Sequence, residues 1–118
     1  MKVIYNNIIP PRGFKYVNLF GLLFGRKKFK DKITATDLNH ESIHTAQMIE
    51  MLVIPFYLWY FLEWLIKLII YPFKKEKKGL HSVYRSISFE REAYSNQDNL
   101  CYLNKRRHYS WFKLIWKE

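Results

Sequence analysis

The stretch from Met51 to Phe73 is almost entirely apolar and aromatic, and it exceeds the roughly 20 residues that a helix needs to cross a bilayer. Glu63 and Lys67 interrupt it at a spacing of four residues, which lets them pair on one helical face. Near the centre of a bilayer each charge would cost about 2.5–3.5 kcal/mol. The fold therefore depends on whether lipid, the rest of the chain or a partner subunit covers this segment. We expect a helix over about residues 56–71.

The chain combines a hydrophobic composition with a strong positive charge. Of its 118 residues, 49% are hydrophobic and 19% aromatic, yet the formal net charge is +10. The basic residues gather at Arg26 to Lys32, Lys74 to Lys78 and Lys105 to Arg107. Such clusters suit anionic lipid as well as plain solvation, and no nucleic-acid-binding motif accompanies them, so we expect no nucleic-acid partner.

The length predicts a single domain covering residues 1–118, with an α+β fold of short N-terminal strands followed by three to four helices. Lys2 to Ile9 and Phe14 to Phe24 are the expected strands. Thr34 and Asp37 have capping-box spacing and predict a helix from about Asp37 to Ile54, ended or kinked by Pro55.

Further helices are expected after the basic linker at 73–79. One should begin at Ser86 or Ser88 and run to about Asn96, because Glu90, Glu92 and Ala93 favour a helix. Asp98 is a possible cap for a last helix, with Leu100, Leu103 and Trp111 on or near its inner side. The lone Cys101 excludes an intrachain disulfide and a cysteine-based zinc site, and no signal peptide is evident at the N-terminus, so we expect an intracellular protein.

The pattern His40-Glu41-Ser42-Ile43-His44 lies within the first expected helix. Residues four apart share one helical face, so both imidazoles can bind one metal ion. Glu41 projects about 100° further around the helix, beside the ion's open position, where a carboxylate can take a proton from water. The pattern predicts a catalytic Zn²⁺ site with His40 and His44 as ligands and Glu41 as general base.

A catalytic zinc needs a third protein ligand, which must be a carboxylate or histidine. The stretch Phe89 to Tyr94 is favoured because it carries two carboxylates on a short helical segment. Gln47, three residues after His44, is a possible hydrogen-bonding support. The full set of candidates for the third ligand is Glu63, Glu76, Glu90, Glu92, Asp98, His81 and His108.

A helix with Glu-x-Glu-Ala after His-Glu-x-x-His resembles the second metal-binding helix of gluzincin peptidases. The resemblance implies that Glu90 is the ligand, with Tyr94 in the supporting position four residues later; Glu92 is the alternative ligand. The chain also resembles a small, uncharacterised bacterial family of membrane-associated His-Glu-x-x-His peptidases, at residues 39–41, 47, 56–60 and 89–94. The group that stabilises the oxyanion has four candidates, and the sequence does not choose among them: Tyr84, Arg85, His81 and Tyr94.

The metal site restricts the topology of the apolar segment. If Met51 to Phe73 crossed a bilayer once, His44 and Glu90 would lie on opposite sides and could not share an ion. A return through hydrocarbon is excluded by the lysines at 74–78. We therefore expect the helix at 56–71 to lie in the membrane interface on the cytoplasmic face, or to be buried against a partner subunit in a homo-oligomer, with Trp59, Tyr60, Trp64 and Tyr71 suited to that interface.

These features predict a membrane-associated zinc peptidase or hydrolase acting on a peptide or protein substrate. The alternative is a non-catalytic adaptor at the membrane surface whose metal holds the helices together. The number of protein ligands distinguishes the two, because a catalytic site keeps one position open.

Overall fold

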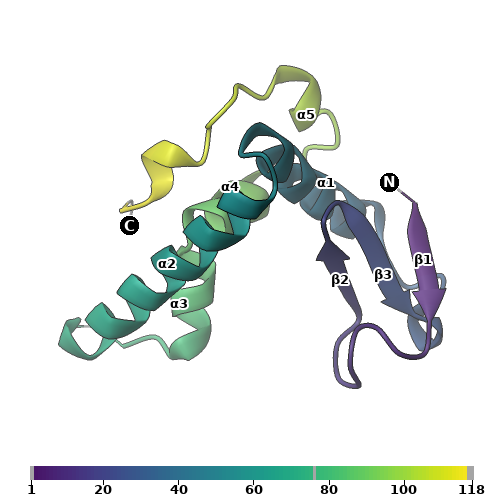
Figure 1. The fold of residues 1–118 in the computed structure, drawn as a ribbon, viewed down its shortest axis with the longest axis horizontal. Helices are drawn as coiled ribbons and strands as arrows, with labels where there is room; N and C mark the ends of the chain where they lie inside the picture. Colours follow the sequence, from purple (N-terminus) through teal and green to yellow (C-terminus); the bar gives the residue numbers. More distant parts are fainter. Residues whose placement is uncertain (1, 76, 117–118) are drawn as a thin grey trace.

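The computed structural model describes residues 2–75 and 77–116, and its α+β fold has a three-stranded sheet at the N-terminus, as predicted (Figure 1). The strands are β1 (Val3–Asn6), β2 (Tyr16–Leu19) and β3 (Leu22–Arg26), in the order β1-β3-β2. β3 pairs in parallel with β1 and antiparallel with β2. Within this sheet β2 is therefore an edge strand.

The prediction of one strand from Phe14 to Phe24 is wrong, because this segment is a hairpin. Leu19 pairs with Leu22, and Phe20 and Gly21 between them have φ of 54° and 89°. Two successive positive φ values match the two-residue turn whose twist suits a hairpin. Gly21 adopts this conformation without the strain that a β-carbon would add. The turn leaves the edge of β2 beside the first helix, where Asn18 Nδ2 donates to the Glu41 carbonyl over 3.0 Å.

Helix α1 (Ala35–Glu50) carries the histidine pair, and its start confirms the predicted capping box. The Thr34 hydroxyl accepts from the Asp37 amide, and the Asp37 carboxylate accepts from the Thr34 amide. The helix ends four residues earlier than expected. Leu52 and Val53 have φ of 61° and 65°, an uncommon conformation for side chains with a β-carbon, and they reverse the chain direction.

Helix α2 (Ile54–Ile70) confirms the predicted apolar helix, but Pro55 begins it rather than breaking the one before. Proline suits the first turn of a helix, whose amides have no partner within the helix. A short 3-10 turn, Tyr71–Phe73, follows. After the sharp turn at Leu52 and Val53, α2 runs beside α3 (Leu80–Ser86) and contacts both α1 and α3 (Figure 1).

The two charges within α2 lie on its buried face and are paired, as their spacing predicts. Lys67 Nζ lies 2.8 Å from Glu63 Oε1, and both side chains are about 95% buried. Glu63 also accepts from the amide and hydroxyl of Ser88, over 2.7 and 2.6 Å, and Lys67 donates to the Ser86 carbonyl. The pair thus binds the junction between the two following helices to α2.

Helices α3 (Leu80–Ser86) and α4 (Ser88–Asn96) meet at Ile87, which is fully buried. The prediction of α4 is confirmed, whereas α3 was not predicted. The expected last helix is wrong: α5 (Tyr102–Lys105) has four residues, and Leu100 and Leu103 are exposed. Of the three residues expected on the inner side of that helix, Trp111 alone is buried, and a 3-10 turn at Phe112–Leu114 follows it. A further 3-10 turn, Lys27–Phe29, follows β3.

The main core lies where α1, α2, α4 and the C-terminal segment meet, and consists of Met48, Phe56, Ile87, Phe89 and Trp111. Tyr60 and Trp64 pack against it and Trp59 contacts the Trp111 ring, so these three aromatic side chains contact the core. One helical stretch among the described residues, Ile54–Phe73, has the length and apolarity of a membrane span, a test that core helices of soluble proteins also pass.

Candidate metal centre

Helix α1 places His40 and His44 one turn apart, and α4 brings Glu90 to the same point from 46 to 50 residues away. His40 Nε2 and His44 Nε2 lie 3.1 Å apart, and Glu90 Oε1 is 3.2 and 3.0 Å from them. All three side chains are at least 93% buried. The residues predicted as metal ligands are therefore the ones that the fold brings together.

The spacing of these three atoms fits a tetrahedral ion. Zinc binds nitrogen and oxygen at about 2.0–2.2 Å, so neighbouring ligand atoms in a tetrahedron are about 3.3 Å apart. The three observed distances, 3.0 to 3.2 Å, lie close to that value. Two imidazoles and a carboxylate are also a donor set that zinc prefers, so the residues fit the ion.

The outer nitrogens of both imidazoles are held by glutamine side chains. His40 Nδ1 lies 2.8 Å from Gln97 Oε1, and His44 Nδ1 lies 2.8 Å from Gln47 Oε1. Gln47 Nε2 donates to the Phe89 carbonyl and to Glu92, which orients the amide oxygen toward His44. When both Nδ1 atoms donate to these amides, both Nε2 lone pairs point at the shared centre, as metal binding requires.

The carboxylate of Glu90 dominates the electrostatics of the centre. Burial lowers the pKa of His44, but the charge and hydrogen bond of Glu90 outweigh it and raise that pKa to about 9. Burial raises the pKa of Glu90, but His44 and the hydrogen bonds from His40, His44 and Tyr60 hold it well below its usual range. The site thus attracts a positive charge between the three side chains, which a cation can supply in place of a proton.

Tyr60 on α2 supports Glu90 from the side opposite the histidines. Its hydroxyl donates to Glu90 Oε2 over 2.7 Å, leaving Oε1 for the shared centre. Burial and the nearby Glu90 raise the pKa of the Tyr60 hydroxyl far above its usual value, so it stays a donor. This role of Tyr60 was not predicted from the sequence, although Tyr60 lies one helical turn after Phe56, on the buried face of α2.

Asn39 and Gln97 were also missed, and both hold the end of α4 against α1. Asn39 Nδ2 donates to the carbonyls of Asn96, Gln97 and Asn99 over 2.8 to 3.3 Å. These contacts satisfy carbonyls at and beyond the C-terminal end of α4 that have no partner within the helix. The adjacent residue His40 is thereby held next to the Gln97 amide.

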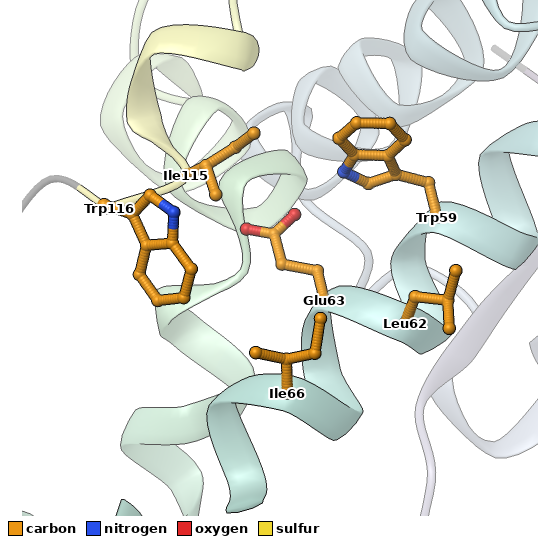
Figure 2. A pocket seen from close by; sticks show the side chains of 6 residues that line it. All are labelled: Trp59, Leu62, Glu63, Ile66, Ile115 and Trp116. Carbon is orange, nitrogen blue, oxygen red and sulfur yellow. The ribbon is translucent and has the colours of Figure 1, made fainter. Parts of the chain in front are cut away.

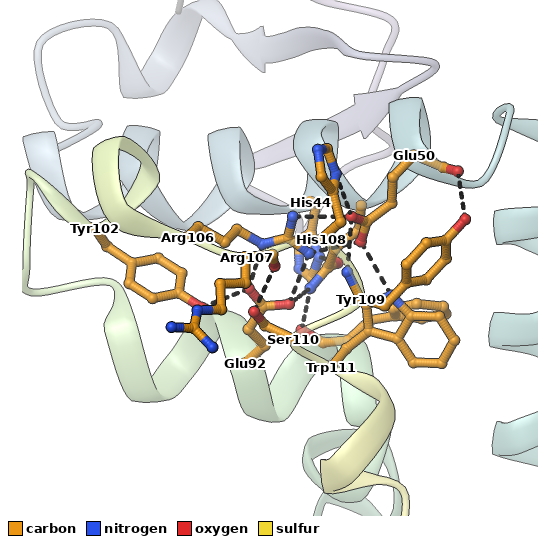
Figure 3. A network of polar contacts seen from close by, with 12 residues as sticks. His44, Glu50, Glu92, Tyr102, Arg106, Arg107, His108, Tyr109, Ser110 and Trp111 are labelled. Atoms are coloured by element: carbon orange, nitrogen blue, oxygen red, sulfur yellow. Dashed lines mark hydrogen bonds and ion pairs between the residues drawn. The ribbon is translucent and has the colours of Figure 1, made fainter.

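Glu92, the alternative ligand, faces away from the centre into a polar network (Figure 3). It is 99% buried and accepts from Gln47, Tyr102 and Arg106. Arg106 also binds Glu50 on α1, over 2.7 and 3.1 Å. Glu92 is therefore a support that acts through Gln47, and its ionic partner is Arg106.

Among the described residues, the other candidates for the third ligand lie away from the centre. Glu63 is held by Lys67 and Ser88, His108 is exposed beside Glu50, and His81 and Asp98 are exposed. Glu76 lies outside the described residues.

A cleft of about 280 Å³ opens beside His44 and Glu90. Glu41, His44 and Glu90 line it together with Tyr60 and Tyr84, and the edge strand β2 contributes Tyr16, Val17 and Asn18. Burial and the charge of Glu90 raise the pKa of Glu41, against the opposing effect of both histidines. A carboxylate with a raised pKa next to an open cleft is placed to accept a proton from a bound water.

Among the four residues proposed as oxyanion stabiliser, only Tyr84 lines this cleft. Burial and the nearby Glu90 raise the pKa of its hydroxyl well above the usual value, so it stays protonated. Tyr94 instead packs its ring on His40, with the ring centres 4.5 Å apart. The Arg85 guanidinium lies over the Tyr94 ring, 4.0 Å from its centre, and His81 is exposed beside Tyr84.

No family model, curated protein or solved structure matches this chain.

Proposed function

We propose that the chain is a zinc-dependent hydrolase of the gluzincin type, with a peptide or protein as substrate. The observation that carries the proposal is the convergence of His40, His44 and Glu90 at tetrahedral spacing beside a cleft lined by Glu41. Three protein donors next to open space are the arrangement of a catalytic zinc site, which keeps one position for water or substrate.

The chain's own groups would divide the work of hydrolysis. His40 Nε2, His44 Nε2 and Glu90 Oε1 would hold zinc, which when bound activates water and polarises the substrate carbonyl. Glu41 takes a proton from the attacking water and passes it to the leaving amine. The hydroxyl of Tyr84 donates a hydrogen bond to the developing oxyanion in the cleft.

The edge strand β2 supports the proposal that the substrate is a peptide. Residues Tyr16 to Asn18 of β2 line the cleft. Strand β3 pairs with one edge of β2, and no strand pairs with its other edge among the described residues. An exposed strand edge can pair with an extended peptide through main-chain hydrogen bonds, which hold the peptide with little dependence on its side chains. The pairing would place one peptide carbonyl next to the metal centre.

The alternative, an adaptor with a structural metal, requires a fourth protein ligand. Among the described residues, the nearest further carboxylate on α4, Glu92, is bound by Arg106 and Tyr102. The cleft at the centre therefore favours the catalytic reading over the structural one.

The deciding experiment compares wild type with Glu41→Gln. We expect both to bind one zinc per chain by metal analysis, and only wild type to cleave a library of quenched fluorescent peptides. Protein that lacks zinc as purified and cannot be loaded with it would contradict the proposal, as would unchanged turnover by Glu41→Gln.

A further inference from the structure

The outward side of α2 is an uninterrupted apolar surface, which we call the α2 face. It consists of Ile54, Leu58, Phe61, Leu62, Ile66 and Ile69, each between 46% and 61% exposed. Both charged residues of α2, Glu63 and Lys67, lie on the opposite, buried side. Soluble monomers rarely expose so many large apolar side chains side by side, so the α2 face requires a partner.

The apolar surface continues from the α2 face onto the C-terminal segment. Between them lies a groove of about 200 Å³, lined by Trp59, Leu62, Ile66, Ile115 and Trp116 above the buried Glu63 (Figure 2). Trp116 is 64% exposed and the neighbouring Phe112 is 60% exposed. The surface is thus wider than one helix and has a furrow where a flexible hydrocarbon chain can lie.

Positive charges flank this surface. Lys74, Lys75, Lys77 and Lys78 follow the C-terminal end of α2, and Lys113 adjoins Phe112; all five are exposed. The chain carries a net charge of +10. A second copy placed on the α2 face would bring two sets of lysines together, whereas a membrane with anionic lipids offers both hydrocarbon and compensating charge.

The buried side of α2 excludes a helix surrounded by lipid. Tyr60 binds Glu90, and Glu63 and Lys67 bind the α3–α4 junction, so polar protein covers this side along most of the helix. If α2 stood upright in a bilayer, the metal-binding residues and α4 would lie at membrane depth. A helix lying flat on the surface keeps them in water.

We propose that α2 lies in the plane of an anionic membrane surface, with the α2 face among the acyl chains and the flanking lysines at the head groups. The cleft belongs to the other side of α2, where Phe56, Tyr57 and Tyr60 line it. The metal centre would thus be held close to the membrane and remain open to water.

The test is flotation of the full chain with vesicles of phosphatidylcholine, with and without a quarter of phosphatidylglycerol. We expect flotation with the anionic vesicles that weakens at high salt, and about tenfold weaker binding for Leu62→Glu and for Ile69→Glu. Leu100→Glu is the matched control, because Leu100 is equally exposed, at 60%, but lies beyond α4, away from the α2 face. Its binding should fall little, and circular dichroism should show all variants folded.

Three outcomes in vitro would overturn the proposal. They are failure of wild type to float with anionic vesicles, equal losses in Leu62→Glu and Leu100→Glu, and a dimer in solution that Leu62→Glu dissociates without any vesicle binding. In cells, protein that resists extraction by alkaline carbonate would indicate a spanning helix and also contradict it. None of these readouts depends on zinc or turnover, so this proposal can fail while the proposed hydrolase stands.

Discussion

His44 Nδ1 lies 2.8 Å from Gln47 Oε1, and this contact joins the metal centre to the polar network behind it. The orientation of the Gln47 amide is set by its donation to Phe89 and Glu92 on α4. The orientation of the His44 ring on α1 is therefore controlled by the docking of α4. Such outer partners commonly change metal affinity by 10- to 100-fold when removed.

Replacing Gln47 by methionine should weaken zinc binding by about 10- to 100-fold, because His44 loses the acceptor that fixes its tautomer. Competition with a chelating dye measures the affinity. Gln97→Met removes the corresponding acceptor from His40 and should have a comparable effect. Unchanged affinity in both variants would show that the two glutamines do not position the ligands.

The pair Glu90→Gln and Glu92→Gln distinguishes ligand from support. We expect Glu90→Gln to lose stoichiometric zinc, because Oε1 is one of the three donor atoms. Glu92→Gln should keep zinc but lower the free energy of unfolding by about 3 kcal/mol, because Arg106 is buried and loses a partner. Metal analysis and urea unfolding measure the two effects, and zinc loss confined to Glu92→Gln would reverse the assignment.

Tyr60→Phe should lower zinc affinity, by about tenfold, because Glu90 Oε2 loses its hydrogen bond and the carboxylate can turn. Tyr57→Phe is the control, since the Tyr57 hydroxyl accepts from the Phe20 amide and contacts none of the three donors. Isothermal titration with zinc compares the two. Equal affinities would mean that Tyr60 does not hold the carboxylate.

Tyr84→Phe should reduce kcat by about 10²-fold or more and leave zinc binding unchanged, if its hydroxyl stabilises the oxyanion. KM should change little, because the hydrogen bond forms mainly in the transition state. Tyr94→Phe retains the ring on His40 and should keep most of the activity. A loss of zinc in Tyr84→Phe would assign Tyr84 to the metal site instead.

Acid should loosen the C-terminal segment through Glu50. Burial raises the pKa of Glu50, but Arg106, the Tyr109 amide and His108 outweigh it and lower the pKa below 4.5, its value in an unfolded chain. Glu50 therefore contributes stability above about pH 4.5 that is lost as the pH falls through its folded pKa. Chemical unfolding of the metal-free protein should show a steeper loss of stability below pH 5 for wild type than for Glu50→Gln. Parallel curves would contradict this role.

Local spacing was enough to predict the elements that carry the ligands. The four-residue interval of His40 and His44, the capping box of Thr34 and Asp37, and the pairing of Glu63 with Lys67 depend on helical geometry alone, which neighbouring residues determine. The α4 helix followed from its helix-forming residues, and the choice of Glu90 came from the resemblance to gluzincin peptidases. The turn at Phe20 and Gly21 was missed because alternating apolar residues on both sides hid it.

What the sequence by itself determined is the helical face that His40 and His44 share and the apolar character of α2. Only the tertiary structure decided that Tyr60 supports Glu90, that Arg106 neutralises Glu92, and that Tyr84 lines the cleft. The contacts of Tyr60 with Glu90 and of Arg106 with Glu92 join residues 30 and 14 positions apart. They depend on how the chain reverses at Leu52 and Val53 and how α4 docks on α1, which no local pattern specifies.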